Sequence, residues 1–180
     1  MEQLTQIYQK SEIIEGLKQS FQDVEQFVTR LNEHDFTFKP GVKWSVAENL
    51  DHLIRSTKGL ASALKKPKIT LRVFGTPNRL SKDFLSLVSK YHSKLQGGGV
   101  ASGPYVPEKN AQFSQNEMLT NWMMIGGKFS ERLGTWSESQ LDDYLLPHPL
   151  LGKLTIREMM FFTIYHNNHH LRAMQLLHSE

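Results

Sequence analysis

Hydrophobic residues return with helical spacing along most of this chain. Apolar side chains recur every three or four positions between about residues 4 and 32, and the same spacing appears in four later segments: 46–64, 81–95, 116–133 and from 156 almost to the C-terminus. No segment shows the alternation of a convincing strand, and no internal repeat is present. The pattern predicts an all-α bundle of long helices with an extra short helix in the middle of the chain.

Local signals indicate where these helices begin and where the chain turns. Two capping boxes are present, in which a serine or threonine can cap a helix and a glutamate three residues later can reach back to it. They are Ser45 with Glu48, and Thr155 with Glu158. Loops are expected at 35–43 and in the glycine-rich stretch 96–104, which is too short to separate domains. Gly126-Gly127 indicates close approach of another backbone or local weakness. At 180 residues we expect one domain, 1–180.

Composition excludes several classes of protein. Hydrophobic residues at 39% and charged residues at 22% are typical of a soluble globular protein. The net charge of +3 comes from dispersed lysines and arginines, densest at 65–68, so we expect no nucleic-acid partner. With no cysteine, the chain can form neither a disulfide nor a zinc–thiolate site. No signal peptide or membrane-length segment is evident, so we expect a cytoplasmic protein without a membrane partner.

Three histidines carry the strongest chemical signal. His166 and His170 lie one helical turn apart within an apolar stripe, where a polar group without a partner is costly to bury. Their Cβ atoms should be roughly 5–6 Å apart, which allows two ring nitrogens to share one ion at about 2.0–2.1 Å. His52 lies beside the apolar stripe of an earlier helix and can face a cavity between helices. The alternative is that these are ordinary hydrogen-bonded core histidines.

A site of His52, His166 and His170 would favour particular metals. Neutral imidazole prefers zinc, nickel, iron or copper to magnesium or calcium. Three protein nitrogens leave at least one coordination position open, as in catalytic sites. A fourth protein ligand would close the site and make it structural, and His148, His169 or a carboxylate could supply it.

Three segments, in order, resemble the DinB-like superfamily of metal-binding four-helix bundles, which includes the bacillithiol transferases: residues 44–53, 148–155 and 166–170. The resemblance implies a four-helix bundle with a long crossover connection and a divalent transition metal, zinc or nickel, bound by His52, His166 and His170. It also implies a homodimer, because related proteins are often dimers. Many members have glutamine three residues after the last ligand, where this chain has Ala173.

The resemblance favours a metal-dependent enzyme that transfers a low-molecular-weight thiol to an electrophilic small molecule. A metal-dependent hydrolase and a non-catalytic metal-binding or regulatory bundle are the alternatives. Since the chain has no cysteine, the thiol must come from a co-substrate. We assign no general base. Six residues are candidates for assisting the reaction beside the metal, although each also has a structural explanation: Trp44, Asn49, His148, Tyr165, Asn168 and His169.

Overall fold

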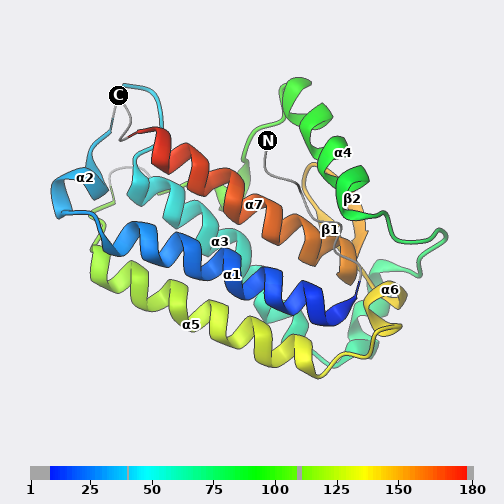
Figure 1. Ribbon diagram of the computed structural model, residues 1–180. Helices are drawn as coiled ribbons and strands as arrows, with labels where there is room; N and C mark the ends of the chain where they lie inside the picture. The colour runs from blue at the N-terminus through cyan, green and yellow to red at the C-terminus, as the bar shows by residue number, and fades with distance from the viewer. Residues whose placement is uncertain (1–8, 40, 109–110, 178–180) are drawn as a thin grey trace.

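Four long helices form a bundle in the computed structural model, which describes residues 9–39, 41–108 and 111–177. They are α1 (Lys10–Thr29), α3 (Val46–Lys65), α5 (Gln115–Gly134) and α7 (Ile156–Leu176). Both α1 and α3 pack against α5 and against α7. The pairs α1/α3 and α5/α7 therefore lie diagonally across the bundle (Figure 1).

Helix direction explains the long crossover. Figure 1 shows that α3 and α5 run in the same direction along the bundle, opposite to α1 and α7. Because a short turn cannot join parallel neighbours, the chain must return along the bundle between α3 and α5. This connection contains η1 (Lys68–Phe74), α4 (Phe84–Gln96), which packs on α7, and η2 (Gly103–Tyr105), which contacts α3. The predicted four-helix bundle with a long crossover and an extra short helix is confirmed.

The expectation that the chain contains no strand was wrong. Strands β1 (Leu145–His148) and β2 (Gly152–Thr155) form an antiparallel hairpin in which Leu145 pairs with Thr155 and His148 with Gly152. Each strand has four residues, too few to establish alternation, and Pro147 interrupts the usual strand signal. The hairpin leads directly into α7, so it positions the start of the helix that carries His166 and His170.

Two short helices and one boundary also differ from the sequence pattern. Helix α2 (Glu33–Thr37) occupies part of a segment expected to be a loop, and Asn32 caps it by accepting a hydrogen bond from the Asp35 N–H. Helix α6 (Gln140–Asp143) precedes the hairpin. Helix α1 begins at Lys10 and ends at Thr29, whereas the periodicity suggested about 4 to 32. The expected helical start at residues 4–8 lies outside the described residues.

The apolar stripes of the four long helices meet in one core. Each helix contributes side chains with no solvent exposure: Leu17 and Val24, Leu50 and Leu53, Trp122 and Phe129, and Met160 and Met174. Both predicted capping boxes form, at the starts of α3 and α7. Within the described part of the chain, no helix has the length and apolar character that a membrane span requires.

Gly126 on α5 is a close contact point, and the approaching group is a side chain rather than another backbone. A Cβ at Gly126 would lie 2.9 Å from Phe21 Cδ1, whereas one at Gly127 would meet nothing within 4 Å. The Phe21 ring cannot easily move, because its centroid lies 4.3 Å from that of Trp122. Packing against Phe21 therefore requires glycine at position 126, whereas position 127 has room for a larger side chain.

Gly126→Ala is expected to lower the free energy of unfolding by about 1–3 kcal/mol, because it overpacks the core. Gly127→Ala is the matched control and is expected to raise this free energy by about 0.5–1 kcal/mol, because alanine favours an exposed helical position. Urea denaturation of both variants measures the difference. Equal effects from the two substitutions would contradict the steric role of Gly126.

Candidate metal centre

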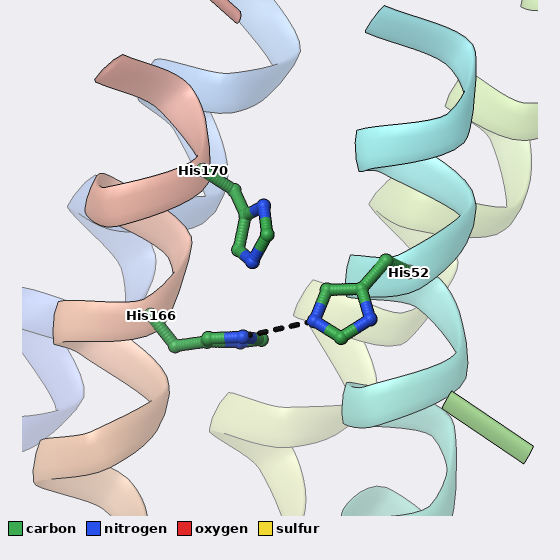
Figure 2. A group of neighbouring side chains, drawn as sticks. All are labelled: His52, His166 and His170. Atoms are coloured by element: carbon green, nitrogen blue, oxygen red, sulfur yellow. Dashed lines mark hydrogen bonds between the residues drawn. The ribbon is translucent and has the colours of Figure 1, made fainter. Parts of the chain in front are cut away.

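The structure brings together the three histidines that the sequence analysis grouped. His52 lies on α3, and His166 and His170 lie on the adjacent helix α7 (Figure 2). One ring nitrogen from each lies within 4.8 Å of the others, and the Nε2 atoms of His52 and His166 are 3.0 Å apart. All three residues are buried, with exposed fractions of 6%, 4% and 8%, respectively. Two facing helices thus direct a convergent set of nitrogen atoms into the bundle.

Hydrogen bonds orient two of the rings. The Nδ1 of His52 donates to the backbone carbonyl of Tyr105 at 2.6 Å, and the Nδ1 of His170 donates to Asn49 Oδ1 at 2.7 Å. Asn49 is itself held because its Nδ2 donates to the carbonyl of Ser45 at 2.8 Å. Since the acceptor oxygens carry no proton, each Nδ1 must carry one, and in a neutral ring Nε2 then carries none and presents a lone pair. In His52 this lone pair faces the Nε2 of His166 at hydrogen-bond distance. This is the arrangement by which proteins orient metal-binding histidines.

Burial keeps these rings neutral. It lowers the pKa of His166 and of His170 well below the ordinary value of 6.5, and neighbouring histidines lower both further. Burial also lowers the pKa of His52, although its hydrogen bond to Tyr105 opposes the shift. Uncharged imidazole is the form that binds zinc, nickel and similar ions. The donor set, its protonation and its orientation therefore fit a divalent transition metal.

These pKa shifts predict acid sensitivity of the metal-free protein. Below about pH 6.5 the histidines protonate in the unfolded chain but not in the folded one, so the unfolded state binds more protons. The free energy of unfolding should then fall as the pH decreases, by about 1.4 kcal/mol per pH unit for each such histidine. Urea denaturation between pH 7 and pH 5, with a chelator present, measures this slope. Replacing both His166 and His170 with asparagine should flatten it, and an unchanged slope would contradict this explanation.

A cavity of about 290 Å³ adjoins the histidine cluster. Its walls come from α3, α4, α7, the β1–β2 turn and residues 100–105, and they are mainly apolar: Leu60, Leu95, Val100, Leu150, Met159 and Phe162. Among the described residues, no aspartate, glutamate, lysine or arginine lines it. The Phe162 ring stacks on His166 with centroids 4.8 Å apart. The candidate metal centre thus opens onto an uncharged chamber large enough for a small molecule.

Of the six residues that the sequence analysis named as candidates for assisting the reaction, four line this cavity or contact the three histidines. The Trp44 ring stacks on that of His170 with centroids 6.2 Å apart and lines the cavity, and Asn49 orients the same histidine. His148 and His169 line the cavity, and the described part of the chain contains no fourth residue in the group of converging donors. The hydrogen bond from His170 gives Asn49 a defined role at the site, that of orienting the His170 ring.

The other two candidate residues, Tyr165 and Asn168, do not line this cavity. The Tyr165 hydroxyl hydrogen-bonds His92 on α4 and does not line the cavity. Asn168 lines a separate surface groove with residues of α1. Sequence reasoning also missed Tyr105, whose backbone carbonyl holds His52. No residue-type signal could have identified it, because every residue carries a backbone carbonyl.

Comparison with known proteins supports the same family as the residue pattern. The family model of the DinB superfamily matches residues 16–174. Among solved structures, the chain resembles YfiT from Bacillus subtilis, described as a probable metal-dependent hydrolase with an unusual four-helix bundle topology. The TM-score is 0.61 at 16% identity, over 98% of this chain and 89% of YfiT, so this likeness concerns the fold alone. No curated protein sequence matched. Because the family model spans most of its length, the chain belongs to the DinB superfamily.

Proposed function

We propose that this protein is a divalent-metal-dependent enzyme that transfers a low-molecular-weight thiol to an electrophilic small molecule. The observation that carries the proposal is a cluster of three neutral, convergent imidazoles on a cavity lined by no charged side chain of the described chain. Such a cavity suits a reaction whose nucleophile is activated by the ion itself.

His52, His166 and His170 would hold the ion, with zinc and nickel as the expected metals. Bound there, the ion would offer an open coordination position and lower the pKa of a thiol that occupies it. The Tyr105 carbonyl and Asn49 fix the rings of His52 and His170, so two of the three donors need little reorganisation. The protein would therefore supply a preorganised ligand set.

The transfer step is a substitution at carbon. The thiol gives up its S–H proton to solvent, the sulfur–carbon bond forms, and the leaving group departs with the electron pair of its bond to carbon. Because the chain has no cysteine, the sulfur must come from a free thiol. Apolar side chains such as Leu60 and Phe162 restrict water in the cavity, which favours attack by the thiolate over hydrolysis.

Metal-dependent hydrolysis is the second candidate, and the description of YfiT favours it. Many zinc hydrolases use a carboxylate beside the ion to take the proton of the attacking water. No aspartate or glutamate of the described chain lines this cavity, so that assistance is missing here. For this reason we place thiol transfer first.

An assay with untagged protein loaded with zinc or with nickel separates these reactions. The thiol-transfer arm uses 1-chloro-2,4-dinitrobenzene with 2-mercaptoethanol or cysteine, and the hydrolysis arm uses p-nitrophenyl acetate without thiol. Thiol transfer predicts a rate that requires both metal and thiol and is lost in His170→Ala. Metal-dependent ester cleavage alone would support the hydrolase, and inactivity of the loaded protein in both arms would favour a non-catalytic role.

A further inference from the structure

His148 ends strand β1 on the wall of the same cavity, and its ring is held by the β1–β2 turn. Its Nδ1 accepts hydrogen bonds from the backbone N–H groups of Leu150 at 3.1 Å and Leu151 at 3.2 Å. Both partners are donors, so Nδ1 must present a lone pair and cannot carry a proton. The turn is tied in addition to α4, because Lys90 Nζ donates to the Leu151 carbonyl at 2.8 Å.

These contacts determine which nitrogen carries the proton. A neutral imidazole with an unprotonated Nδ1 has its hydrogen on Nε2, so His148 is a donor at that atom. Burial together with the nearby charge of Lys90 lowers the pKa of His148 to about 4, in agreement with a neutral ring. Among the described residues, none forms a hydrogen bond with Nε2. The ring therefore contributes one unused N–H to the wall of an uncharged cavity.

The position of His148 relates this donor to the histidine cluster. Its ring packs edge-on against Phe162, with centroids 4.3 Å apart, and Phe162 in turn stacks on His166. Phe162 thus contacts both His148 and a histidine of the cluster. Binding an ion through Nε2 would require the proton to move to Nδ1, which would break both backbone hydrogen bonds. This cost argues against His148 as a fourth metal ligand.

We propose that His148 donates a hydrogen bond from Nε2 to the substrate, and that the cavity binds an uncharged, mainly apolar molecule that offers an acceptor oxygen, such as that of a carbonyl or nitro group. This deepens the proposed function and rests on it for the reaction, but not for the binding. No charged side chain of the described chain lines these walls to pair with a charged group of the electrophile, and the ion of the proposed function would be occupied by the thiol sulfur. A neutral acceptor finds a preoriented donor at His148, and most of the remaining wall is apolar, with hydroxyl groups such as those of Tyr91 and Ser102 also lining the cavity.

Two substitutions separate the donor from the turn contact. His148→Asn keeps an acceptor near the position of Nδ1 but removes the donor at Nε2. His148→Gln keeps a donor near the position of Nε2 but removes the acceptor for the turn. Zinc-loaded protein would be titrated with acetophenone and with ethylbenzene, which differ in the carbonyl group, and NMR shifts would give both Kd values. Thermal denaturation and zinc content would be measured alongside.

In the native protein, NMR of the histidine side-chain nitrogens should show Nδ1 of His148 unprotonated and Nε2 protonated at pH 7. His148→Asn should weaken the binding of acetophenone relative to that of ethylbenzene by about two- to tenfold, which is the contribution of one neutral hydrogen bond. Zinc content and thermal stability should be retained. His148→Gln should lower thermal stability yet keep more of the preference for acetophenone.

An unchanged Kd ratio in His148→Asn, a protonated Nδ1, or no binding of acetophenone to native protein at millimolar concentration would each overturn the proposal. The binding ratio requires no turnover, which keeps it independent of the reaction. Native protein that binds acetophenone through His148 but transfers no thiol would contradict the thiol-transfer proposal alone.

Discussion

Replacing His170 with alanine is expected to weaken binding of zinc or nickel by more than about 100-fold, because even residues that only orient a ligand contribute 10–100-fold. The substitution removes one of three convergent donors and also leaves the Asn49 Oδ1 without its hydrogen-bond partner. Two remaining imidazoles would hold the ion through fewer bonds and with less fixed geometry. The reaction proposed for this site should be lost with the ion.

Elemental mass spectrometry of untagged protein measures this loss as metal per chain. His34→Ala is the matched control, because the side chain of His34 is 80% exposed on α2 and removing it tests nonspecific binding by histidine. We expect about one ion per chain in the native protein and in the control, and almost none in His170→Ala. Equal metal content in all three proteins would refute the three-histidine site.

Glu158→Ala is expected to lower the free energy of unfolding by about 2–4 kcal/mol, because it leaves the backbone N–H groups of Thr155 and Lys82 without their acceptor. The Arg79 side chain is 36% exposed, so water can solvate the charge that remains. The Glu158 carboxylate is fully buried and accepts hydrogen bonds from Arg79 at 2.6 and 2.9 Å. It also accepts from the backbone N–H groups of Lys82 and Thr155. Burial alone would raise the pKa of Glu158, but these hydrogen bonds reverse the effect and lower it, so the group is ionised at neutral pH.

Glu48→Ala is the control, because Glu48 occupies the same position in the capping box of α3. The Glu48 side chain is 16% exposed and pairs with Lys39, whose own side chain is 49% exposed, so water can replace the lost contact. We expect a cost of about 0.5–2 kcal/mol, typical of a lost cap. Urea denaturation of both variants gives the comparison. A similar loss in the free energy of unfolding for both variants would show that the hydrogen bonds around Glu158 contribute little stability beyond that of the helix cap.

The local part of the fold follows from the sequence. Periodicity and the Ser45 and Thr155 caps located α3 and α7, because helical spacing and capping depend on residues within one or two turns. The spacing of His166 and His170 likewise fixed their common face before any tertiary contact was known. The hairpin was missed because four-residue strands are stabilised by their pairing and their packing rather than by their own pattern.

Tertiary structure alone decided how these local elements make a site. The parallel arrangement of α3 and α5 depends on helix packing and on the crossover, which periodicity does not determine. The partners of His52 and His170 lie 53 and 121 residues away along the chain, and one of them is a backbone carbonyl. The sequence by itself therefore determined which histidines were candidates, because residue type and spacing are local properties. Only the folded chain decided their tautomers and the uncharged cavity that they face, because hydrogen bonding and burial arise from contacts between distant segments.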